Sequence, residues 1–144
     1  MIRSLTTMLV LLLCLSSNAF AEQKEKVGNF DIHYVALSST FLTPSIAKSY
    51  GIKRRSYTGI INIAVLDTSV EGNPAVPVEL SGVANNLLDA RIDLKFREIR
   101  EGDAIYYIAE VPYRDDQEIN FKIAVKYDKK LNTTLTFKQK FYVE

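Results

Sequence analysis

The stretch EINFKIAVKY, residues 118–127, carries an apolar side chain at every second position. A β-strand points successive side chains to opposite faces, so this period of two predicts a strand with one buried and one solvated face. The buried row would be Ile119, Phe121, Ile123, Val125 and Tyr127, and the solvated row Asn120, Lys122, Ala124 and Lys126.

The C-terminal residues repeat the pattern. One predicted face holds Leu135, Phe137, Phe141 and Val143, and the other holds Thr134, Thr136, Lys138 and Lys140. The link between the two strands, residues 128–132 (DKKLN), has a length that suits a hairpin.

Five further segments read as strands between turn signals: 30–36, 59–66, 76–82, 92–96 and 105–111. The fourth and fifth are expected to pair as a hairpin across Glu101–Asp103. The segment 59–66 (GIINIAVL) is apolar on both faces, which predicts a central strand covered on both sides. Together these patterns predict an all-β fold, a single immunoglobulin-like antiparallel β-sandwich of about seven strands. A small closed barrel is the alternative.

One segment interrupts the strands. Thr43 and Pro44 are typical of a helix start, and Tyr50-Gly51 is typical of a helix end with a left-handed cap. We therefore expect one short helix, Pro44 to Tyr50, after the first strand.

The first 21 residues have the order of a secretory signal peptide. Arg3 precedes an apolar run from Met8 to Leu15, and Ala19-Phe20-Ala21 is an A-x-A cleavage site. The predicted organisation is a signal peptide over 1–21, a mobile charged tail over 22–26 and a β-sandwich domain over 27–144. The one cysteine, Cys14, lies inside the signal, so the mature chain would have no thiol.

Charge is balanced in the predicted mature chain. The full sequence has 18 Lys and Arg against 17 Asp and Glu, and removing Arg3 leaves 17 of each. A neutral chain gives no electrostatic reason to expect a nucleic acid or an anionic membrane surface as partner.

Few residues offer catalytic or metal chemistry. The one histidine, His33, has no companion ligands at zinc-site spacing and no serine context of the nucleophile type. We therefore predict no enzyme activity, no catalytic residue, no bound metal and no cofactor.

The connector 50–57 (YGIKRRSY) is the most unusual segment, because three consecutive cations lie between two tyrosines. Arginine forks and aromatic faces are common in recognition surfaces, so Tyr50, Lys53, Arg54, Arg55 and Tyr57 are the candidate binding residues. We expect Arg55 to fold back toward the sheet and Arg54 to face solvent. The alternative is a solvated connector whose arginines pair with local acids or helix-end carbonyls.

Three polar residues are assigned structural roles. A buried Asn62 inside an apolar strand must be hydrogen-bonded, and it would tie the neighbouring Arg55-Ser56 loop to the sheet. Ser56, within that loop, and Asn85 are assigned structural roles as well.

The chain resembles a family of small secreted gammaproteobacterial proteins that share a domain of unknown function. The resemblance rests on Phe41–Pro44, Tyr50–Ile52, Arg55-Ser56, Asn62, Gly82–Leu87 and Ile105–Tyr107. It implies a periplasmic location and no assigned activity.

The sequence favours a soluble periplasmic module that binds a ligand or an envelope or periplasmic protein. The alternative is a factor for the assembly or stability of envelope proteins that offers a sheet edge to a partner strand. A hydrolase is the third possibility.

The signal-peptide interpretation predicts export and cleavage after Ala21. Intact-mass measurement of the protein from a periplasmic fraction should give a chain that begins at Glu22. A product that keeps Met1, or one with a lipid on Cys14, contradicts the prediction.

Overall fold

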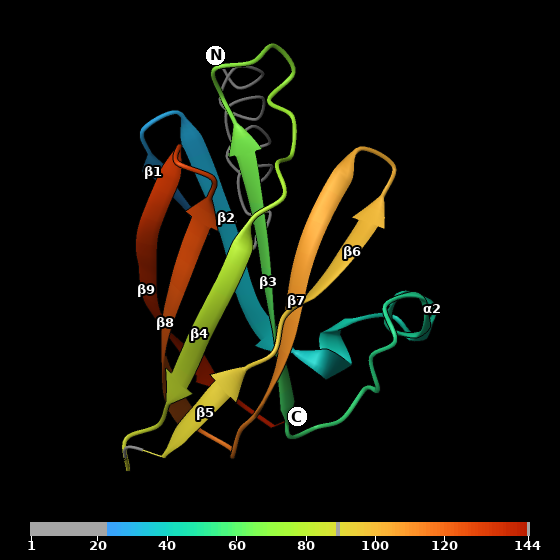
Figure 1. Ribbon diagram of the computed structural model, residues 1–144. Helices are drawn as coiled ribbons and strands as arrows, with labels where there is room; N and C mark the ends of the chain where they lie inside the picture. Colours follow the sequence, from blue (N-terminus) through green and yellow to red (C-terminus); the bar gives the residue numbers. More distant parts are fainter. Residues whose placement is uncertain (1–22, 89, 144) are drawn as a thin grey trace, which may run out of the picture.

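The computed structural model describes residues 23–88 and 90–143, so the predicted signal peptide lies outside the described residues. The described chain is nine strands, one 3-10 turn and one short helix (Figure 1). In chain order these are β1 Gln23–Val27, β2 Phe30–Ser38, η1 Ser39–Phe41, α2 Pro44–Ser49, β3 Thr58–Asp67, β4 Glu79–Asn85, β5 Arg91–Leu94, β6 Arg97–Glu101, β7 Ala104–Pro112, β8 Gln117–Tyr127 and β9 Leu131–Phe141.

The strands form two facing sheets. The five-stranded sheet has the order β1-β2-β3-β7-β6, and the four-stranded sheet has the order β5-β4-β8-β9. Every pairing is antiparallel. The predicted β-sandwich is therefore confirmed, with nine strands rather than about seven, and the helix follows the second strand rather than the first.

The segment expected to be a mobile tail is a strand. Residues Gln23–Val27 form β1, which pairs with β2 along its whole length. Lys24 and Lys26 approach the largely buried carboxylate of Asp31 at 3.5 and 3.9 Å. Charge is common on edge strands, so the charged composition that suggested a tail is equally compatible with a sheet edge.

The hairpin expected between 92–96 and 105–111 is wrong in its pairing. Residues Arg91–Leu94 form β5 and pair with β4, whereas Arg97–Glu101 form β6 and pair with β7. Between them the chain crosses from one sheet to the other at Lys95-Phe96, as strands do at the corner of a sandwich.

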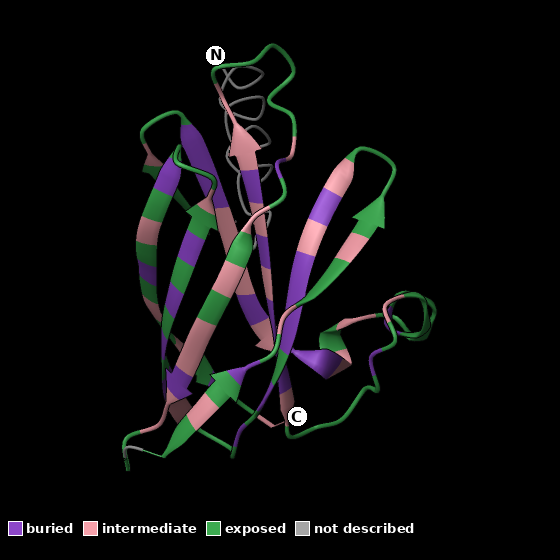
Figure 2. Ribbon diagram, in the orientation of Figure 1, coloured by how far each residue is buried: buried purple, intermediate pink, exposed green. Residues whose placement is uncertain are grey.

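The core lies between the sheets and follows the predicted alternation. Ile119, Phe121, Ile123 and Val125 are all buried, and β8 alternates buried and exposed bands in Figure 2. The Phe121 ring packs against Phe137 and Phe141, with centroids 4.9 and 6.4 Å apart. A Cβ added at Gly59 would lie 2.6 Å from the Phe141 ring, so that position requires glycine.

A second, smaller core covers the outer face of the five-stranded sheet. Ala47 and Ile52 bury themselves against Ile60 of β3 and Ile108 of β7. We call residues 39–57, which include η1, α2 and the connector, the flap. Because β3 has the main core on one face and the flap on the other, the prediction of a strand covered on both sides is confirmed.

We predict that Phe121→Ala destabilises the fold by about 3–5 kcal/mol, because the ring is buried and the surrounding side chains cannot fill the space. Chemical denaturation of Phe121→Ala and of its exposed neighbour variant Lys122→Ala measures the difference. Lys122→Ala should stay within about 0.5 kcal/mol of the parent. A loss below about 1 kcal/mol in Phe121→Ala would mean that this ring is not part of the packed core.

Candidate interaction surface

The flap contains a capped helix, as predicted. The Thr43 hydroxyl accepts a hydrogen bond from the Ile46 backbone N–H at 3.2 Å, and Pro44 occupies the first turn. Gly51 follows the C-cap Tyr50 with a φ of +67°, a conformation that glycine adopts without strain. The helix Pro44–Ser49 is one residue shorter than expected.

The two ends of the flap are joined by one buried hydroxyl. Ser39 is fully buried, and its Oγ accepts the Arg55 backbone N–H and donates to the Arg55 carbonyl, both at 2.8 Å. Beside it, Tyr113 donates its hydroxyl to Ser38 Oγ at 2.9 Å. These hydrogen bonds therefore hold the two ends of the flap together at its base.

The tie expected from the sequence, between Asn62 and the Arg55-Ser56 loop, is a different contact. Ser56 is exposed, whereas Ser39, directly after β2, holds the Arg55 backbone. The available signal was the pair Ser38-Ser39 directly after apolar strand residues, since hydroxyls carried into a core must find partners.

Arg54 is exposed, as expected, whereas the side chain of Arg55 is also exposed and does not fold back toward the sheet. Arg54 Nη2 donates to the Thr40 carbonyl at 3.0 Å and so braces the flap. Arg55 is exposed, and the contacts with Ser39 involve its backbone. Lys53 is also exposed, so all three cations of the connector are presented to solvent.

The two tyrosines differ as well. Tyr50 donates its hydroxyl to Glu101 of β6 at 2.8 Å, and this hydrogen bond, with partial burial, raises the pKa of Tyr50 to about 12. Tyr50 thus fastens the flap to the sheet and lines an open hollow of about 320 Å³ with Ile46 and Ile99. Tyr57 is 59 % exposed and remains available for contact.

The two asparagines do not make the expected ties. Within residues 23–88 and 90–143, Asn62 Oδ1 and Asn85 Oδ1 are buried and have no hydrogen-bond partner. The structural asparagine is Asn86, whose Oδ1 accepts from the N–H groups of Leu88 and Ala90 at 3.0 Å each.

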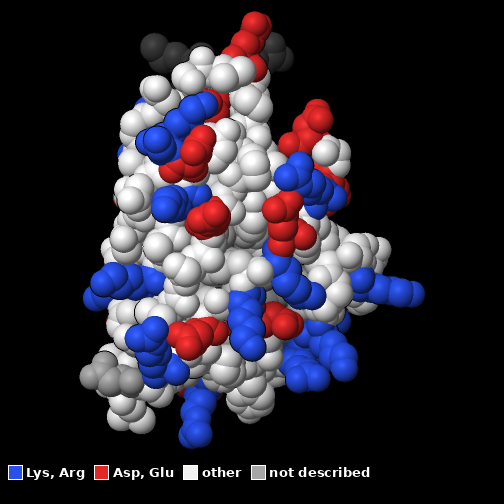
Figure 3. Space-filling model, in the orientation of Figure 1, with Lys and Arg blue, Asp and Glu red and all other residues white. Residues whose placement is uncertain are grey.

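The flap concentrates positive charge in a nearly neutral chain. No Asp or Glu occurs between Asp31 and Asp67, and this interval contains Lys48, Lys53, Arg54 and Arg55. Blue side chains gather at the lower right of the molecule in Figure 3, where Figure 1 places the flap. Large apolar side chains lie exposed among them, with Phe41 54 % and Ile46 43 % exposed.

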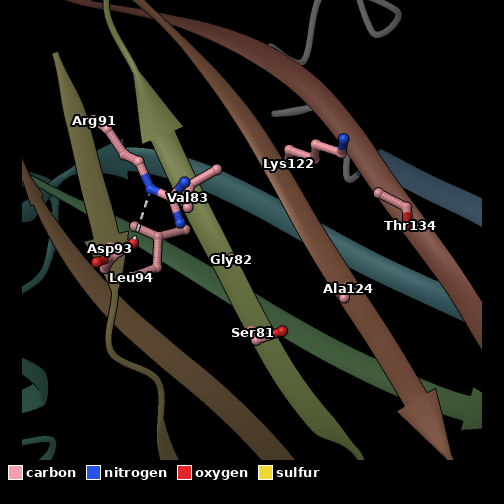
Figure 4. A pocket seen from close by; sticks show the side chains of 9 residues that line it. All are labelled: Ser81, Gly82, Val83, Arg91, Asp93, Leu94, Lys122, Ala124 and Thr134. Carbon is pink, nitrogen blue, oxygen red and sulfur yellow. Dashed lines mark hydrogen bonds and ion pairs between the residues drawn. The ribbon is translucent and has the colours of Figure 1, made fainter. Parts of the chain in front are cut away.

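A second hollow lies on the outer face of the four-stranded sheet (Figure 4). It measures about 400 Å³ and is open, and short side chains from three adjacent strands (Ser81, Ala124 and Thr134) form its floor. Its carboxylate, Asp93, is engaged by Arg91 at 3.2 Å. Across the described residues no group of three or more His, Cys, Asp or Glu side chains could hold a metal ion.

The protein is an antiparallel β-sandwich with a cation-bearing flap on one sheet. The family model described as "Domain of unknown function (DUF4426)" matches residues 24–144, so the chain belongs to that family. A DUF4426 family protein from Pseudomonas aeruginosa PAO1 is 29 % identical, with a TM-score of 0.73 over 85 % of this chain and 96 % of that one. This agrees with the resemblance seen in the sequence.

Structures of FetP have a similar fold. A copper-bound variant of FetP from uropathogenic Escherichia coli strain F11 has a TM-score of 0.60 at 12 % identity, over 86 % of this chain and 97 % of that one. As-isolated FetP, which was expressed in the periplasm of E. coli, gives the same TM-score and identity. A comparison with curated proteins finds no match. Among the described residues no helix is long and apolar enough to cross a membrane.

We predict that Ser39→Ala destabilises the protein by about 1–3 kcal/mol, because it leaves the part-buried N–H of Arg55 without a partner. It also removes one of the two hydrogen bonds to the Arg55 carbonyl, which keeps the Thr58 N–H at 3.2 Å. Ser56→Ala is the matched control and should change stability by no more than about 0.5 kcal/mol. Thermal or denaturant unfolding of both variants makes the comparison. Equal losses in the two would refute the role of Ser39.

Proposed function

We propose that this chain is a periplasmic interaction module, without catalytic activity, that binds an acidic protein segment through the flap. The observation that carries the proposal is an ordered, acid-free segment with four cations on a chain of nearly neutral net charge. The signal-peptide pattern and the family resemblance support the periplasmic location.

Order in the flap supports recognition, because a preformed surface loses less conformational entropy on binding. Ala47 and Ile52 anchor the flap in its own core, Ser39 closes its base, and Tyr50 ties it to β6. The cations of the connector therefore extend from a fixed backbone rather than from a mobile loop.

The chemistry of the exposed side chains selects the partner. The Arg55 guanidinium can grip a carboxylate with two parallel hydrogen bonds, and Lys53 adds a neighbouring point charge. Tyr57, with Phe41 and Ile46, offers apolar contact area beside these charges. A polypeptide segment with several carboxylates and some apolar residues matches both features.

The hypothesis predicts that an oligo-glutamate peptide binds the protein and that binding weakens as salt screens the charges. The double variant Lys53→Glu/Arg55→Glu should bind about tenfold more weakly, equivalent to 1.4 kcal/mol. Fluorescence anisotropy of the labelled peptide at low and high ionic strength measures both effects.

The matched control is Lys95→Glu/Lys129→Glu, which makes the same change in net charge at exposed residues outside the flap. It should bind the peptide as the parent does. Absence of binding by the parent, or equal weakening in the two double variants, would rule out the flap as the binding surface.

A further inference from the structure

The four edges of the two sheets are not equivalent. Three of them, β1, β5 and β6, are strands of five, four and five residues. Each carries charged side chains, and charged, short edges resist unwanted pairing. The fourth edge, β9, has 11 residues and pairs with β8 alone within the four-stranded sheet, while β1 and β2 of the facing sheet also contact it.

Most of β9 lacks the usual protection. Residues 131–137 (LNTTLTF) contain no charged residue, no proline and no glycine, and they pair regularly with β8. In an antiparallel pair, alternate residues direct their N–H and C=O groups away from the partner strand. Along β9 these groups form a row that a further strand can bond.

We propose that this edge accepts an extended segment of a partner protein by strand addition, at a site separate from the flap. Backbone hydrogen bonds would supply affinity, and the side chains on the two faces of the added strand would supply specificity.

The side chains around β9 indicate the composition of that segment. On the outer face, Lys138 lies on β9, and Lys122 and Lys126 lie on β8. Lys140, further along β9, is already paired with Asp116 at 2.9 Å. On the inner face, Leu135 is buried and Phe137 is half-buried against Tyr34, with ring centroids 4.6 Å apart. An added strand therefore fits best when acidic residues on its outer face alternate with apolar residues on its inner face.

A second copy of this chain fits the edge poorly. If the uncharged run 131–137 paired antiparallel with itself over its full length, Lys130 would face Lys138 at both ends. Like charges directly opposite one another destabilise a strand pair, so the edge favours a different, acidic partner.

The experiment uses a peptide of about eight residues with alternating valine and glutamate, and a scrambled peptide containing two prolines as control. Amide hydrogen exchange is followed residue by residue on the folded protein. We expect the first peptide to slow exchange about tenfold at alternate amides of β9, and the control peptide to have no effect. Protection confined to the flap, or absent, would overturn the proposal. So would protection of β9 that rises with protein concentration in the absence of peptide.

A pair of variants, Thr133→Pro and Thr134→Pro, tests the backbone bonds. Successive residues of a strand direct their N–H groups to opposite sides, so one of Thr133 and Thr134 directs its N–H toward β8 and the other toward solvent. Proline at the first of these positions should break a hydrogen bond to β8 and destabilise the fold. The variant with proline at the other position should keep the fold and bind the alternating peptide about tenfold more weakly, while its alanine counterpart binds normally. Unchanged peptide binding by the stable proline variant would overturn the proposal. Retention of oligo-glutamate binding by that variant would show that the flap site is independent.

Discussion

The proposed binding surface depends on the buried hydroxyl of Ser39. This one side chain uses its donor and its acceptor on the same residue, Arg55, which stands 16 positions away in the chain. It thereby fixes the separation of the two ends of the flap at the point where the chain leaves and rejoins the sheet. A hydroxyl buried among apolar residues is costly without partners, which makes the closed arrangement strongly preferred over an open one.

The flap and the sandwich stabilise each other through β3. On its inner face β3 contributes Ile61, Ile63 and Val65 to the core between the sheets, and on its outer face Ile60 meets the flap. Such a strand has to be apolar on both sides, which its sequence shows. Without the flap, Ile60 on β3 and Ile108 on β7 would be exposed to water. The flap therefore covers the sheet, and the same segment carries the cations.

The sequence predicted the features that depend on local pattern. Alternation located β8 and β9 and the correct buried face, and capping residues located the helix from Pro44 onward. Features set by tertiary context were not predictable. The alternation of apolar and polar residues continues through residues 91–101, so it gives no sign that the chain passes there from one sheet to the other. The roles of Arg54, Arg55 and Ser39 depend on partners far away in the sequence. Of the candidate binding residues, Lys53, Arg54, Arg55 and Tyr57 are exposed on the flap. Tyr50 and Arg54 also brace the flap through hydrogen bonds.

The central claim is that the flap is a rigid surface, and native-state hydrogen exchange of its amides tests this most directly. The N–H groups of Ala47, Ile52 and Arg55 are hydrogen-bonded to Thr43, Ala47 and Ser39, at 2.9, 2.8 and 2.8 Å. They should exchange far more slowly than those of an unstructured chain and respond to denaturant together with β3. Exchange of these three amides at the rate of an unstructured peptide, in a protein whose β3 amides are protected, would contradict the account.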